Sequence, residues 1–308
     1  MRFAIESWDP AYGSSMEGGL DEAAGPVDAT IELPLDQWRP LLPPAVGAPP
    51  AVVFIDGVRR IDSRIWISDG ALARPGLCAT VAAGAVLCRP HRAQVVGARV
   101  ARGLHTAVDG ATAIPTRRCG TYQLRTAIGD DDQMLYTSVH QHMTALEHQV
   151  SAELEPAAIT VYDGPLRGRD DVGGVGYVKS QHVQYLEPPQ QAVVAALGDG
   201  ERTPLFAIGG RFSRWSWYLR LPGPRAHALS GVVRLELPGL GEPASAADRA
   251  DHISAVLPRF ASKPHADARA PQNLYPIAGL ERHLRRILGD PGFLERDLRR
   301  AARQPSPV

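Results

Sequence analysis

The feature that most constrains the fold of this chain is a change of hydrophobic period between residues 51 and 163. AVVFID, starting at Ala51, is a continuous apolar run ending on an acid, and VRRIDSRIWI after it alternates apolar and polar residues as a half-buried strand does. Further strands are predicted at 77–88 and 93–104. From Asp131 to Glu155 apolar residues recur every three or four positions, which predicts an amphipathic helix that Pro156 ends. ITVYD then reads as a second buried strand. This order predicts an α/β fold, a mixed sheet flanked by helices.

The rest of the sequence adds a short helix at PPQQAVVAAL, three strands between residues 203 and 238, and C-terminal helices. A length of 308 residues allows one large domain or two small ones, and no linker divides the chain. We therefore expect one main domain at 46–290. An acidic, Pro/Gly-rich arm is expected at 1–45, and a basic helix and tail at 291–308.

Charge is balanced overall but unevenly distributed. The chain has 33 basic and 33 acidic residues, so its net charge gives no indication of nucleic-acid binding. Residues 1–56 hold nine acids against two arginines, whereas residues 89–129 hold seven arginines against Asp109 alone. The basic segment either tracks phosphates or is a solvated face. The C-terminal arginines likewise either bind DNA or suit the helix dipole.

Several classes of protein are disfavoured. Three cysteines without metal-ligand spacing argue against a disulfide framework or a zinc ribbon. No apolar run reaches the roughly 18 residues of a membrane helix, and the N-terminus lacks the apolar run of a secretory signal. We expect a cytoplasmic protein with no membrane association. No Gly-x-Ser-x-Gly motif supports an α/β-hydrolase.

Both buried strands end in Asp-Gly, with Asp56 in FIDG and Asp163 in VYDG. Either one alone is also a common turn. Together they place two carboxylates at the rim of one sheet, and oxygen-only ligation suits Mg²⁺ or Mn²⁺. Glu147 and Glu153 of the intervening helix are candidates for a third carboxylate. Glu147 is preferred because a mid-helix position is better fixed, and a solvated glutamate is the alternative for both.

The sequence resembles the NurA nucleases. The resemblance lies in AVVFIDGVRRID, ITVYDGPL, GVGYVKS and YPIAGLERH, in that order, from about Ala51 to Leu288. It implies a ribonuclease H-like fold and a homodimer with Mn²⁺-dependent (or Mg²⁺-dependent) 5′–3′ exonuclease and single-strand endonuclease activity. It also implies DNA end processing with a HerA-like hexameric ATPase as partner.

The resemblance also implies individual roles. Asp56 and Asp163 match metal-binding aspartates, Glu147 takes the place of the helix glutamate by approximate spacing, and Tyr275 and His283 match the C-terminal tyrosine and histidine. His283 is expected to ligate a metal or position the phosphate. Lys179 is one of two lysines in the chain, and an ammonium there suits phosphate contact or the orientation of water.

Two questions stay open on the sequence. A catalytically inactive DNA-binding or assembly subunit of a HerA-type complex is the alternative to a nuclease, although such a scaffold has no physical need for Asp56, Asp163, Lys179, Tyr275 and His283 together. RFSRWSWYLR, at 211–220, interleaves arginine with aromatic residues. One face of this strand is expected in the core, and the other is expected to stack bases or to form a dimer contact.

Overall fold

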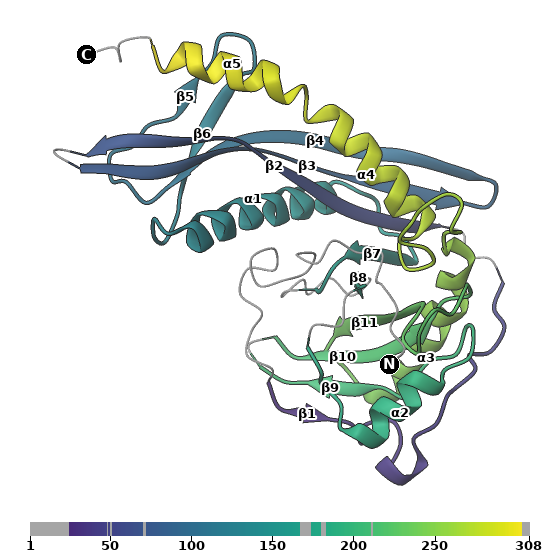
Figure 1. The fold of residues 1–308 in the computed structure, drawn as a ribbon. Helices are drawn as coiled ribbons and strands as arrows, with labels where there is room; N and C mark the ends of the chain where they lie inside the picture. Colours follow the sequence, from purple (N-terminus) through teal and green to yellow (C-terminus); the bar gives the residue numbers. More distant parts are fainter. Residues whose placement is uncertain are drawn as a thin grey trace.

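The computed structural model describes residues 25–47, 49, 51–69, 72–166, 174–179, 183–210 and 212–303. The statements below concern these residues. The expected mixed α/β architecture is present, with one large sheet, helices on both of its faces and two helices at the C-terminal end (Figure 1).

The 11-stranded sheet has the order β1-β9-β10-β11-β8-β7-β2-β3-β4-β6-β5. It is mixed, because β7 runs parallel to both β2 and β8, and β6 runs parallel to β4, while the other pairs are antiparallel. The strands are β1 (Val27–Asp28), β2 (Val52–Asp69), β3 (Leu72–Arg89), β4 (Arg92–Thr106), β5 (Ile114–Pro115), β6 (Thr121–Thr126), β7 (Ile159–Asp163), β8 (Gly174–Val178), β9 (Phe206–Ile208), β10 (Arg214–Arg220) and β11 (Val232–Pro238).

The helices bury the two faces of the sheet in separate cores. The helix α1 packs on one face of the long β2–β3–β4 meander, and α4 packs on its opposite face (Figure 1). The helix α3 contacts β10 and belongs to the same core as α4. Alternate residues of β2 divide between these cores: Val53 and Ile55 lie on the α1 side, Phe54 and Val58 on the α4 side. The helical elements are η1 (Leu35–Gln37), α1 (Asp132–Ala152), α2 (Pro188–Ala196), α3 (Pro243–Val256), η2 (Leu257–Phe260), α4 (Tyr275–Ile287) and α5 (Pro291–Ala301).

The described part of the expected N-terminal arm packs against the main domain. The strand β1 pairs with β9, and Leu41 forms a bridge to Arg202. The Arg202 guanidinium, almost fully buried, binds Glu32 at 2.7 Å and Asp251 of α3 at 2.6 Å. An arginine bound from two sides holds this segment on the domain; the boundary at residue 45 stays a prediction.

Two expectations are wrong. The strand β2 does not end at Asp56 but continues through Gly57 to Asp69, because β3 pairs with it along almost its whole length. The strand β10 leaves neither face free for bases or a dimer partner. Trp217 packs in the core beneath α3, and Tyr218, on the other face, stacks with Phe206 in a second core.

Candidate metal centre

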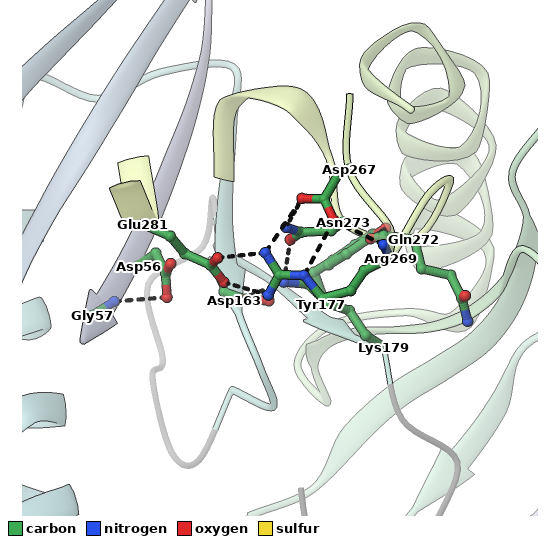
Figure 2. A network of polar contacts seen from close by, with 10 residues as sticks. All are labelled: Asp56, Gly57, Asp163, Tyr177, Lys179, Asp267, Arg269, Gln272, Asn273 and Glu281. Carbon is green, nitrogen blue, oxygen red and sulfur yellow. Dashed lines mark hydrogen bonds and ion pairs between the residues drawn. The ribbon is translucent and has the colours of Figure 1, made fainter. Parts of the chain in front are cut away.

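The centre of the site is a set of three carboxylates from three separate elements. Asp56 of β2, Asp163 at the end of β7 and Glu281 of α4 each present an oxygen, and these oxygens lie within 4.8 Å of one another (Figure 2). The parallel pairing of β2 with β7 explains why the aspartates meet. The ladder runs from Val52 opposite Ile159 to Ile55 opposite Tyr162, so each aspartate is the next residue on its own strand. Side chains in register on neighbouring parallel strands project on the same face.

Glu281 reaches the cluster because it lies on the apolar face of α4. Ile277, Leu280 and Leu284 are fully buried on that helix, and Glu281 falls within the same stripe at helical spacing. Pro276, in the first turn, suits a helix start. Glu281 was not among the site residues expected from the sequence. A charged residue at an apolar position of an amphipathic helix was the available signal.

Two cations hold two of these carboxylates. The Nζ of Lys179, which follows β8, donates to Asp163 Oδ2 at 2.7 Å and to Asn273 Oδ1 at 2.9 Å. The Arg269 guanidinium binds Glu281 with two parallel hydrogen bonds of 3.1 and 2.6 Å. Asp267 supports both cations, since it contacts Arg269 and accepts a hydrogen bond from Asn273 (Figure 2). Arg269, Asp267 and Asn273 lie in the loop before α4, where no sequence pattern marked them.

Asp56 differs, because no described cation pairs with it. Its Oδ1 accepts the Gly57 backbone N–H at 2.7 Å, and its Oδ2 is buried without a hydrogen-bond partner among the described residues. Asp163 Oδ1 is in the same condition. Burial, and then the charge of Asp163, raise the pKa of Asp56 well above its ordinary value, against the opposing effect of Lys179. Burial also raises the pKa of Asp163, although Lys179 opposes this shift.

Glu147 lies beside Gly57 on the α1 side of β2. A methyl group added at Gly57 would lie 2.5 Å from Glu147 Oε1 and 2.8 Å from Met143 Cγ. Glu147 therefore occupies the space that a side chain at position 57 would need. Glu147 is 4% exposed, and its charge contributes to the raised pKa of Asp56. Glu153, the other candidate, lies on the surface in an ion pair with Arg99 at 2.6 Å.

The two remaining predicted residues lie on α4 outside the three-carboxylate set. Tyr275 begins the helix and is 40% exposed. His283 is half-buried, and its Nδ1 lies 3.3 Å from an Arg286 nitrogen. The structure thus brings together Asp56, Asp163 and Lys179, with Glu147 next to them. Roles for Tyr275 and His283 stay predictions from the motif YPIAGLERH.

The fold and site together describe a mixed α/β protein with a buried carboxylate centre between β2, β7 and α4. No protein-family model matches the sequence, and no curated protein matches it. Among solved structures, the chain is similar to the NurA nuclease from Sulfolobus solfataricus, with a TM-score of 0.49 and 12% identity over 82% of this chain and 86% of that one. It is also similar to endonuclease V from Bacillus subtilis, with a TM-score of 0.33 and 9% identity over 80% and 85% of the two chains. None of the described helices is long and apolar enough to cross a membrane.

Proposed function

We propose that this chain is a divalent-metal-dependent nuclease that hydrolyses phosphodiester bonds of DNA at the centre formed by Asp56, Asp163 and Glu281. One observation carries the proposal: Asp56 and Asp163 each keep a buried carboxylate oxygen without a partner among the described residues, and Asp56 has no described counter-ion. Leaving a charged group in this condition costs free energy unless a further positive charge binds there.

The donor set fits a hard cation. Three converging carboxylates, with oxygen as the available ligand atom, suit Mg²⁺ or Mn²⁺ better than a metal that prefers sulfur or imidazole. Asp56, Asp163 and Glu281 would hold the ion, with Glu147 as a further candidate ligand. When bound, such an ion lowers the pKa of a coordinated water and stabilises negative charge on a phosphate oxygen.

The remaining groups prepare the site. Lys179, fixed by Asp163 and Asn273, keeps an ammonium beside the ligands, where it can stabilise charge that develops on the phosphate. Arg269 acts as a positioning residue, because its bidentate contact fixes the rotamer of Glu281. Burial excludes competing water from Asp56 and strengthens each of these electrostatic interactions.

The finer features of the proposal rest on the motif resemblance described above. They are 5′–3′ exonuclease and single-strand endonuclease activity, a preference for Mn²⁺, a homodimer, a HerA-like hexameric ATPase as partner, a role in DNA end processing, and a cytoplasmic location. Metal-binding by His283 and a contribution of Tyr275 belong to the same group. The alternative is an inactive DNA-binding or assembly subunit of a HerA-type complex.

The test is degradation of labelled single- and double-stranded DNA with Mn²⁺, with Mg²⁺ and with EDTA. We expect metal-dependent cleavage by the wild type and a loss of at least about 10²-fold in Asp56→Asn. Asp132→Asn is the matched control, because Asp132 is an exposed carboxylate paired with Arg64. Its rate should be that of the wild type.

A folding control completes the experiment. Asp56→Asn removes a buried charge repelled by Asp163, so its thermal stability in EDTA should equal or exceed that of the wild type. Cleavage that survives Asp56→Asn, or that needs no metal, would contradict the proposal. A folded wild type that binds DNA without cleaving it under any of these conditions would support the inactive subunit.

A further inference from the structure

A charged cavity lies between the C-terminal half of α5 and the β5–β6 connection. The C-terminal end of α5 points away from α4 (Figure 1). Its volume is about 260 Å³. It is lined by Pro115, Arg117, Asp297, Arg300, Ala301 and Arg303. Arg117 belongs to the basic segment at 89–129, and the other two arginines belong to the C-terminal set. Two sequence-distant basic stretches therefore meet here.

Hydrogen bonds fix the geometry of this cavity. Asp297 of α5 accepts the backbone N–H groups of Arg118 at 2.8 Å and Cys119 at 3.1 Å. The Thr116 hydroxyl closes the same turn by donating to the Gly120 carbonyl at 2.6 Å. Asp297 is 2% exposed, so this attachment is a buried one. It holds the turn, and Arg117 within it, against α5.

The arginines of the cavity lack counter-ions. Within the described part of the chain, Arg117, Arg300 and Arg303 make no side-chain hydrogen bond or ion pair. Asp297 stays ionised because its two backbone donors lower its pKa, so its single negative charge offsets only one of the three arginine charges. Arg299 on the same helix shows the ordinary arrangement, an exposed pair with Glu295 at 2.7 Å. Three arginines against one carboxylate leave an excess of positive charge in the cavity, which favours binding of an anion.

The ligand chemistry follows from the donors. A guanidinium presents a planar fork of N–H groups that matches the oxygens of a phosphate. Asp297 Oδ1, buried and without a partner among the described residues, adds an acceptor suited to a hydroxyl or amino group next to that phosphate. A phosphate joined to a donor-bearing sugar or base is a nucleotide unit.

We propose that this cavity binds a backbone phosphate of a DNA strand whose cleavage occurs at the carboxylate centre, an inference that rests on the proposed nuclease function. The helix α5 has 11 residues, or about 16 Å at 1.5 Å per residue, and it separates the cavity from α4. Phosphates of one strand of a duplex are spaced by about 3.4 Å along the axis, so a strand that reaches from the cavity past α5 to Glu281 of α4 spans several nucleotides. The cavity is an anchor for the strand outside the cleavage site.

The test is DNA affinity in EDTA, where cleavage does not interfere. The double variant Arg300→Ala/Arg303→Ala is compared with Arg296→Ala/Arg299→Ala, which removes the same charge from the same helix but leaves the cavity lining intact. Fluorescence anisotropy with a labelled single-stranded oligonucleotide should show about tenfold weaker binding for the first variant and less than a twofold change for the second. The slope of log affinity against log salt should fall by about 0.7 for each phosphate that the variant no longer binds.

Further measurements separate the possible failures. Metal-dependent hydrolysis of bis(4-nitrophenyl) phosphate, which is too small to reach α5, should be equal in both variants and the wild type. If this hydrolysis occurs and the two variants bind DNA alike, the anchor is overturned and the nuclease stands. If the wild type neither hydrolyses the ester or DNA nor binds DNA, the proposed function fails and the anchor with it. Displacement of DNA from the wild type by millimolar inorganic phosphate, at constant ionic strength, would contradict the proposal. It would show that the cavity binds free phosphate and not a DNA strand.

Discussion

Two buried ionic clusters of this chain differ in how completely their charges are matched. Around Arg202, the Nε donates to Asp251 at 2.6 Å, and the two terminal nitrogens bind Glu32 at 2.9 and 2.7 Å. Glu32 also accepts the Leu205 backbone N–H at 2.6 Å. At the carboxylate centre, by contrast, Asp56 and Asp163 keep oxygens without a described partner.

The contrast separates a structural cluster from a chemical one. A cluster with matched donors and acceptors gains nothing further from a ligand, and its value to the protein is the attachment of the N-terminal segment to α3. A cluster with unmatched carboxylates is less stable by itself and is stabilised by a cation. Substitutions in the Arg202 cluster should therefore change stability, and substitutions at the carboxylate centre should change catalysis.

The largest stability effect is expected at Arg202. Arg202→Met leaves Glu32 and Asp251 without their shared counter-ion, which should lower the free energy of unfolding by about 3 kcal/mol. Denaturant titration measures this loss, and Arg225→Met is the control. Arg225 pairs with Asp199 on the surface, where about half of each side chain is exposed, so its loss should cost less than about 1 kcal/mol. If folded Arg202→Met molecules cleaved DNA more slowly than the wild type, the Arg202 cluster would also serve catalysis, and the two clusters would not differ in function.

A smaller effect, on rate alone, is expected at the helix glutamates. Glu147→Gln should slow metal-dependent DNA cleavage by roughly 10²-fold, because the carboxylate is buried beside Gly57 and its charge acts on Asp56. Glu153→Gln removes a surface ion pair with Arg99 and should leave the rate unchanged. Equal rates for the two variants would show that the third carboxylate of the reaction is Glu281 without help from α1.

The smallest expected effect is a pH dependence of stability without metal. The folded-state pKa of Asp56 is raised above its unfolded value near 3.8, so its contribution to stability is fully present below that pH and is lost as pH rises through the folded pKa. The melting temperature in EDTA should therefore fall as pH rises above 3.8. Asp56→Asn should flatten the curve, and Mn²⁺ should reverse it, because metal binding displaces the proton. A wild-type curve as flat as that of Asp56→Asn would mean that Asp56 is already ionised.

Local patterns in the sequence were enough for the architecture and for part of the centre. Two apolar runs, each ending in an aspartate, predict the convergence of Asp56 and Asp163, and the parallel pairing of β2 with β7 brings the two residues together. The rarity of lysine pointed to Lys179. The preference for Glu147 over Glu153 agrees with the buried place of the first and the exposed place of the second.

The rest depends on contacts that no local pattern encodes. Arg269 reaches Glu281 from an irregular loop, and its role exists only because the loop folds back against α4. The continuation of β2 past Asp56 is set by β3, which pairs with it from Val52 to Asp69. The burial of Tyr218 likewise depends on distant residues, among them Phe206 of β9 and Val194 of α2, so the second face of β10 is also covered.

The spacing of the three carboxylates along the chain has a consequence for biosynthesis. Asp56, Asp163 and Glu281 are separated by more than a hundred residues each. Chains are made from the N-terminus at about 5–20 residues per second, so a nascent chain passes many seconds with two of the three carboxylates at most. Arg269, which binds Glu281, is made only twelve residues before it. The three-carboxylate set is therefore complete only after residue 281 has been made, and products that stop before it lack the full ligand set.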